Sequence, residues 1–183
     1  MTHYIDIKLM PKKEIRENVL LNQVYTSFHK RLYDLKSNNI AVSFPEYRLK
    51  LGRLFRIHGS IEALDKLQEK DWLGKYAEFC KVSKIEAIPE KVQYRTVSRI
   101  QQNMTEAKLR RLIKRGNIPE EDIKKYRIKI FQGGLDNPYV ELRSMSNGQM
   151  HRRFMEFGEL QDAEVKGEFD LFGLSKIATI PWF

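Results

Sequence analysis

Hydrophobic and polar residues alternate with two different periods along the N-terminal half of the chain. Apolar side chains occupy every second position in the first segment and every third or fourth position in the next, which predicts a strand followed by an amphipathic helix. The predicted elements are, in order, a strand (4–9), a helix (14–36), two strands (38–45 and 53–59), a helix capped by Ser60 (61–72) and a strand (77–89). This βαββαβ order predicts a ferredoxin-like module, which RNA-recognition domains share with many unrelated proteins.

The pattern changes after Pro89. An extended segment is followed by a helix that we expect to end at Gly116, and Pro119 starts another short helix. The segments predicted in this half are an extended stretch (94–102), a helix (105–116), a short helix from Pro119 and strand patterns (137–146, 148–157 and 167–183). We place a boundary near residue 92, so the predicted protein is α+β, with a ferredoxin-like domain (1–92) and a smaller C-terminal α+β domain (93–183).

The composition and net charge of the chain indicate which class of partner it binds. The chain of 183 residues is 42% apolar, which is enough to bury a core, and its formal charge is +9. A positive field of this size favours an anionic partner such as nucleic acid or a phospholipid surface. No stretch approaches the roughly 18 apolar residues of a membrane-spanning helix, and the N-terminus enters a strand pattern without a signal-peptide segment. We therefore expect a cytoplasmic protein without a membrane partner.

Cysteine and histidine usage argues against a metal site. The single cysteine, Cys80, excludes an internal disulfide and is interpreted as a small core residue. The four histidines, His3, His29, His58 and His151, lie far apart without neighbours at ligand spacing. We expect no metal and no cofactor, and we interpret His58, in a strand pattern, as a core histidine.

The helix predicted at 105–116 is strongly basic on one side. Leu109, Leu112 and Ile113 share one face. The opposite arc carries the cations Lys108, Arg110, Arg111, Lys114 and Arg115. Charged arcs are usually solvated helix faces, but those normally include acids for pairing, and only Glu106 is available here. Nucleic-acid binding is the favoured interpretation, because an RNA or DNA backbone would relieve the repulsion. A membrane-surface role is disfavoured, since the apolar face lacks Trp or Phe anchors.

Two further polar residues precede this helix. In an extended segment Arg99 and Gln101 point the same way, and these side chains can bind guanine and adenine through two hydrogen bonds each. The major groove of an RNA helix is too deep and narrow to read along its length, so such a reader would act at the end of a helix or hairpin.

Several sequence blocks, taken together and in order, resemble the repeat-processing endoribonuclease of subtype I-F CRISPR systems. The blocks are HYIDIKLMP, FHKRL, NIAVSFP, FRIHGS, YRTVSRIQ, the arginine-rich helix, LRSMSNGQ and the terminal FGLSK and PWF. The resemblance implies a ferredoxin-like N-terminal domain and a second domain bearing the arginine-rich helix. It also implies metal-independent cleavage of CRISPR precursor RNA at the 3′ foot of a repeat stem-loop, with retention of the crRNA hairpin. The implied partners are this stem-loop and the other subunits of a type I-F surveillance complex.

The resemblance assigns a role to His29. From spacing alone, His29 lies at the edge of the apolar stripe of its helix and would be an ordinary rim histidine. In the family the corresponding histidine acts on the ribose 2′-OH beside the scissile phosphate, so the resemblance implies that His29 is the general base. The 2′-oxygen would then displace the 5′-oxygen of the next nucleotide and leave a 2′,3′-cyclic phosphate.

The remaining assignments are also implied by the resemblance. Ser144 matches a serine that positions the 2′-OH, with Ser146 as the alternative; the other interpretation of Ser144 is a hydroxyl at a strand end. Ser146 and Asn147, in a Ser-Asn-Gly turn, are counted among the RNA-binding positions. Phe172 stands where the family often has a tyrosine, so only aromatic packing is expected there. His151 stands where an aromatic residue stacks under the last base pair of the stem; the other interpretation of His151 is an exposed surface residue.

Two functions therefore compete. The favoured one is an endoribonuclease that uses His29 and Ser144, with Arg99 and Gln101 at the foot of the stem. The alternative is a non-catalytic RNA-hairpin-binding module that uses the same basic helix.

Overall fold

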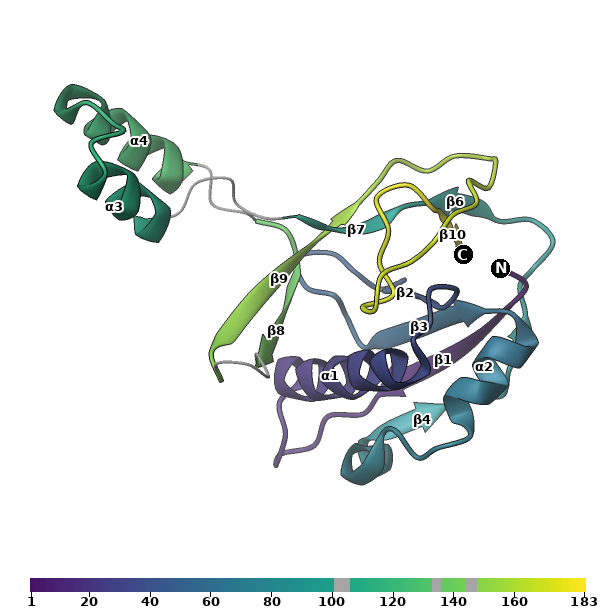
Figure 1. Ribbon diagram of the computed structural model, residues 1–183. Helices are drawn as coiled ribbons and strands as arrows, with labels where there is room; N and C mark the ends of the chain where they lie inside the picture. The colour runs from purple at the N-terminus through teal and green to yellow at the C-terminus, as the bar shows by residue number, and fades with distance from the viewer. Residues whose placement is uncertain (101–105, 133–135, 144–147) are drawn as a thin grey trace. The chain divides into compact units, whose positions relative to one another are not determined.

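The computed structural model describes residues 1–100, 106–132, 136–143 and 148–183, and the chain divides into two compact units. The main unit comprises Met1–Arg99 and Asn137–Phe183, and the helical unit comprises Ile100–Asp136. Figure 1 labels their α-helices and most of their strands. The predicted division near residue 92 does not coincide with these units, because segments from both halves of the chain share the core of the main unit.

The main unit contains two helices, a 3₁₀ helix and antiparallel strands. Its elements are β1 (His3–Leu9), α1 (Glu17–Leu35), β2 (Ala41–Ser43), β3 (Leu54–Gly59), α2 (Ile61–Gln68), η1 (Gly74–Phe79), β4 (Cys80–Val82), β5 (Glu86–Ala87), β6 (Gln93–Arg95), β7 (Val97–Ile100), β8 (Tyr139–Arg143), β9 (Met150–Phe157) and β10 (Ile180–Trp182). The first sheet has the order β2-β3-β1-β4, with β5 also pairing β1. A second sheet has the order β7-β9-β8, and β10 pairs with β6.

One face of the first sheet packs on α1. Alternation puts Ile5, Ile7, Phe55 and Ile57 on this face, all fully buried. The ring of Phe55 lies 5.3 Å from that of Phe28 on α1, so the apolar stripe of the helix meets the apolar face of the sheet. The period-two and period-3.6 patterns in the sequence therefore predicted β1 and α1 correctly.

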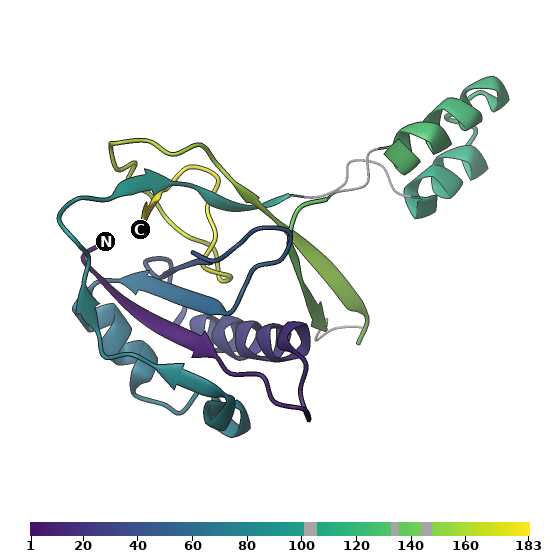
Figure 2. The ribbon, with the colours of Figure 1, turned by 180° about the vertical axis from the view of Figure 1, so that it is seen from behind.

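The opposite face of the sheet meets the C-terminal end of the chain. Arg56 donates two hydrogen bonds to Asp6, at 2.6 and 2.9 Å, and a third to the backbone carbonyl of Phe183 at 2.7 Å. The ring of Phe183 packs edge-on against Tyr4. The two termini accordingly lie close together, as Figure 2 shows.

Two predicted strands are largely irregular. Within 77–89, residues 77–79 belong to η1, which begins at Gly74, and only β4 and β5 are strands. Within 167–183, only β10 is a strand, since residues 170–174 form a tight turn described below.

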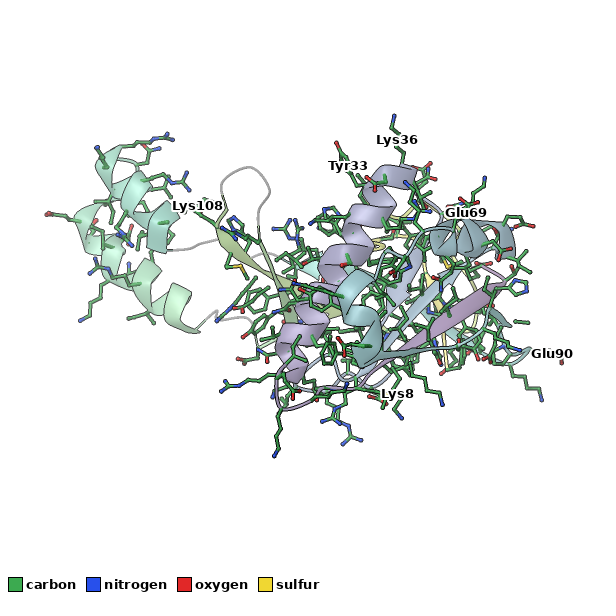
Figure 3. All side chains as sticks on the ribbon, turned by 90° about the horizontal axis from the view of Figure 1, so that it is seen from below. Lys8, Tyr33, Lys36, Glu69, Glu90 and Lys108 are labelled. Atoms are coloured by element: carbon green, nitrogen blue, oxygen red, sulfur yellow. The ribbon has the colours of Figure 1, made fainter. Side chains whose placement is uncertain are left out.

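The helical unit contains α3 (Glu106–Lys114) and α4 (Glu120–Gln132). Gly116 ends the first helix as predicted: its φ is 69° and its N–H donates to the carbonyl of Ile113. Leu109 is buried, whereas the predicted basic arc is exposed. Figure 3 labels Lys108 on this arc. Negative side chains in the first turn of α4 suit the positive end of the helix dipole.

Candidate active site

His29 lies near the middle of α1, half-buried, and is held by two contacts. Its Nδ1 is 2.7 Å from the carbonyl oxygen of Leu171. Its ring stacks on Phe172, with the centroids 3.7 Å apart and the planes 13° from parallel. A carbonyl oxygen only accepts hydrogen bonds, so Nδ1 is the protonated nitrogen of the neutral ring. The lone pair is therefore on Nε2.

The turn that supplies these contacts is tightly built. The carboxylate of Asp170 accepts hydrogen bonds from the backbone N–H groups of Phe172 and Leu174, at 2.8 and 3.0 Å. Gly173 has a φ of 71°, a conformation that favours glycine. Its carbonyl accepts a hydrogen bond from the N–H of Val42 at 3.0 Å, which anchors the turn to β2.

A tyrosine of α1 also holds this turn in place by a hydrogen bond. Tyr25 is fully buried, and its hydroxyl donates to the carbonyl oxygen of Phe172 at 2.8 Å. Burial raises the pKa of Tyr25 well above its ordinary value, so this hydroxyl stays protonated and keeps donating. Phe172 packs against His29, and the backbone carbonyl of Leu171 accepts the hydrogen bond that orients the ring. Tyr25 and Asp170 hold the turn that carries both.

The environment of His29 favours its neutral form. Burial lowers the pKa of His29 below its ordinary value of 6.5, and the positive charge of Arg153 lowers it further. The Leu171 carbonyl and the Asp170 carboxylate act in the opposite direction, but the net shift is downward. The imidazole is therefore a base at neutral pH.

His29 opens onto a pocket of about 840 Å³. The pocket is lined by Thr26, His29, Lys30, Tyr33, Asp34, Arg99, Leu142, Arg143, His151, Arg153 and Phe172. Figure 3 shows Tyr33 toward the C-terminal end of α1. Several cations surround a single acid, Asp34, among these lining residues, so the pocket suits an anionic ligand.

The pocket brings together four residues singled out from the sequence. His29 comes from α1, Arg99 from β7, His151 from β9 and Phe172 from the C-terminal turn. The predicted phosphate ligands Lys108, Arg110, Arg111, Lys114 and Arg115 belong to the helical unit. Gln101, Ser144, Ser146 and Asn147 lie outside the described residues.

Arg153 is one of the pocket residues that sequence reasoning did not single out. Its guanidinium carbon lies 3.7 Å from the centroid of Phe172. The signal was the period of two along β9, which puts Arg153 on the same face as His151 and the buried Met155. On the other face Arg152 forms an ion pair with Glu141 at 2.9 Å.

Other reactive side chains are placed away from this pocket. His58 is fully buried, its Nε2 lies 2.8 Å from the hydroxyl of Ser43, and burial lowers its pKa to about 3. Burial raises the pKa of Cys80 to about 11, which disfavours the thiolate. Among the described residues, no group of three or more His, Cys, Asp or Glu side chains is arranged so that it could bind a metal ion. In the same part of the chain no helix is long and apolar enough to cross a membrane.

Comparison with known proteins identifies the relatives of the chain. The family model described as CRISPR-associated protein (Cas_Csy4) matches residues 4–183. A CRISPR-associated endonuclease Cas6/Csy4 of Escherichia coli (strain UTI89 / UPEC) is 33% identical over 184 residues, covering 100% of both chains. Its namesake in Pseudomonas aeruginosa (strain UCBPP-PA14) is 36% identical over 187 residues, again covering 100% of both chains.

A solved structure provides a weaker similarity. The CRISPR endoribonuclease Cse3 bound to a 19-nucleotide RNA aligns with 99% of this chain and 100% of its own, at 11% identity and a TM-score of 0.41. That similarity is too low to support an assignment, whereas the full-length sequence matches above support one.

Proposed function

The chain belongs to the Cas_Csy4 family of CRISPR-associated proteins, and we propose that it is an endoribonuclease that processes CRISPR repeat RNA. It binds the stem-loop of the repeat, cleaves at the 3′ foot of the stem and retains the crRNA product. The observation that carries this proposal is the hydrogen bond from His29 Nδ1 to the Leu171 carbonyl, which leaves the lone pair on Nε2. His29 lines a pocket that also contains several cations.

The proposed reaction is an internal transesterification. Nε2 of His29 removes the proton of the ribose 2′-OH, and the 2′-oxygen attacks the adjacent phosphorus in line. The P–O5′ bond breaks, the 5′-oxygen leaves and takes a proton from solvent, and the upstream product ends in a 2′,3′-cyclic phosphate. RNA is required because DNA lacks the 2′-OH. His29 removes the proton and solvent protonates the leaving group, so we expect cleavage without added metal.

Further roles follow the pocket and the sequence. Ser144 positions the 2′-OH, with Ser146 as the alternative; Arg143, which precedes Ser144, lines the pocket. Arg99 and Gln101 contact the foot of the stem, and His151 stacks on its last base pair. The exposed basic arc of α3 binds phosphates of the stem, and Asn147 is part of the RNA-binding turn.

We extend the proposal to architecture and partners. The order β2-β3-β1-β4, all antiparallel, supports a ferredoxin-like N-terminal domain, with the basic helix in a second, C-terminal domain. The protein acts in the cytoplasm and associates with other subunits of a type I-F surveillance complex.

The test is cleavage of an end-labelled repeat hairpin in EDTA, with end-group analysis of the upstream product. We expect a 2′,3′-cyclic phosphate, no cleavage when the nucleotide before the cut carries deoxyribose, and a His29→Ala variant that binds the hairpin without cutting it. The general base contributes about 10²–10⁴-fold to the rate. An RNA that is bound but stays intact would instead favour the non-catalytic hairpin-binding module.

A further inference from the structure

Arg153 occupies an unusual position in the pocket. Its guanidinium lies over the ring of Phe172 at 3.7 Å, and the imidazole of His29 stacks on the same ring at 3.7 Å. Both groups cannot fit over one face at this distance, so they cover opposite faces. Phe172 is therefore the middle layer of a His29–Phe172–Arg153 stack.

The stack leaves the hydrogen-bond donors of Arg153 at its edge. A guanidinium donates in its own plane, so a face packed on an aromatic ring leaves the N–H groups free to point sideways. Arg153 lines the pocket beside His29 and Arg99. Its Nε is buried and has no hydrogen-bond partner in the described part of the chain, which carries a free-energy cost.

The charges around Arg153 favour an anion at this position. Burial lowers the pKa of Arg153, and the neighbouring positive charge of Arg99 lowers it further. Asp170 and Tyr25 act in the opposite direction, but one carboxylate oxygen of Asp170 already accepts two backbone hydrogen bonds of the turn. Arg99 and Arg153 thus line the same pocket, together with Arg143, and a bound anion would offset both the desolvation of Arg153 and its repulsion by Arg99.

We propose that Arg153 is a further catalytic residue, whose guanidinium binds the scissile phosphate together with Arg99 and stabilises the charge that develops on it during attack. This inference rests on the proposed function. Phe172 holds the cation and the base in one rigid stack, so proton removal by His29 and charge stabilisation by Arg153 act on adjoining atoms of one nucleotide.

The neighbouring residue provides a matched control. Arg152 is the same residue type on the same strand, but it points to the other face, where it pairs with Glu141 and lies over Tyr139. Substituting Arg152 removes one positive charge of the protein without touching the stack. A general effect of net charge on RNA binding would therefore appear in both variants.

The first experiment compares single-turnover cleavage by the wild type, Arg153→Gln, Arg153→Lys and Arg152→Gln at saturating protein. We expect Arg153→Gln to slow cleavage about 10²–10³-fold, as for loss of one preorganised donor, and Arg152→Gln to change the rate less than about 3-fold. Arg153→Lys keeps the positive charge and should recover part of the rate. If the Gln variant does not fold, the comparison between Arg153→Lys and the wild type still tests the inference. Equal rates for wild type and Arg153→Gln would overturn the inference.

The second experiment separates phosphate binding from a packing role. Substrates carry sulfur in place of either non-bridging oxygen of the scissile phosphate. The wild type should cleave one diastereomer more slowly, because sulfur weakens the contact between Arg153 and that non-bridging position. This slowing should shrink in Arg153→Gln, because the variant has already lost the contact. An unchanged sulfur effect in a slow variant would show that Arg153 only supports the stack and would refute phosphate binding. If the wild type itself does not cleave the hairpin, the proposed function fails instead.

Discussion

The hydrogen bond between His29 and the carbonyl oxygen of Leu171 determines which ring nitrogen can act as the base. Residue identity and spacing put His29 at the rim of a helix but gave no information on its tautomer. That depends on a carbonyl 142 residues later in the chain, which folding brings to 2.7 Å from Nδ1. The same turn supplies Phe172, so the base and its aromatic support are positioned together.

The lowered pKa of His29 predicts the pH dependence of cleavage. A general base acts when unprotonated, so kcat/KM should rise with pH through the pKa of His29 in the free enzyme and then level off. Because burial lowers this pKa below 6.5, the midpoint of the rise should lie below pH 6.5, with a flat profile at neutrality. Single-turnover rates at subsaturating protein from pH 4.5 to 8 would measure this, whereas a midpoint above 6.5 would contradict the assigned environment.

At the scale of elements, the C-terminal turn is the most constrained segment of the site. A Cβ at Gly173 would lie 3.1 Å from both Phe28 and the backbone nitrogen of Val42, and its φ of 71° disfavours other residues. Gly173→Ala should therefore destabilise the protein by about 1–3 kcal/mol, more than the conformational cost alone, and slow cleavage by displacing Phe172 and Leu171. Thermal unfolding and cleavage rates would test both effects.

Gly74 is the matched control for that substitution. It also has a positive φ, of 52°, but a Cβ there would meet nothing within 4 Å. Gly74→Ala should show the conformational cost alone, of up to about 1–2 kcal/mol, with the cleavage rate of the folded protein unchanged. Equal loss of cleavage in both variants would mean that the turn has no special role.

The basic arc of α3 predicts strong salt dependence of hairpin binding. If its five exposed cations contact phosphates, log K should fall by on the order of four units per tenfold rise in salt. Lys114→Gln should reduce this slope by about one while leaving the cleavage rate at saturation unchanged. Lys125→Gln is the control, because Lys125 of α4 already pairs with Asp122 at 3.0 Å. Equal slopes for wild type and Lys114→Gln would remove Lys114 from the interface.

Sequence patterns predicted the helices better than the last strands. Both α1 and α3 have a sustained apolar period, and α3 ends at Gly116 as expected. Segments 77–89 and 167–183 also contain apolar and β-branched residues, but the Asp71 and Asp170 carboxylates accept backbone hydrogen bonds that form turns just before the first segment and within the second. Such contacts depend on tertiary position, which periodicity does not encode.

At the scale of the whole main unit, residues of both chain ends form one core. Val97, Val140 and Met155 are buried in the same cluster as Ile5 and Phe55, which a boundary drawn at a change of composition near residue 92 did not anticipate. The sequence also could not show that His151 and Arg153 would face His29, because their approach depends on β9 packing in this core. The sequence singled out some of the residues that line the pocket, but not their assembly into one pocket.

Substitution of Arg56, which contacts Asp6 and Phe183, would test whether the two ends of the chain unfold together. Arg56 is 7% exposed and joins Asp6 of β1 to the carbonyl oxygen of Phe183. Arg56→Leu would leave the Asp6 carboxylate unpaired in a partly buried site, so we expect a loss of about 3 kcal/mol or more of unfolding free energy. Because the cluster links both ends, one cooperative transition should shift as a whole in urea unfolding.

A more exposed ion pair provides a control for the free-energy cost expected of Arg56→Leu. Arg53 pairs with Glu17 at 2.6 Å, but the Arg53 side chain is 56% exposed, so Arg53→Leu should cost less than about 1 kcal/mol. If Arg56→Leu were as mild, the contact between the sheet and the C-terminus would not stabilise the fold. If instead the transition split in two, the C-terminal segment would unfold separately, and the turn that holds His29 would be lost before the sheet.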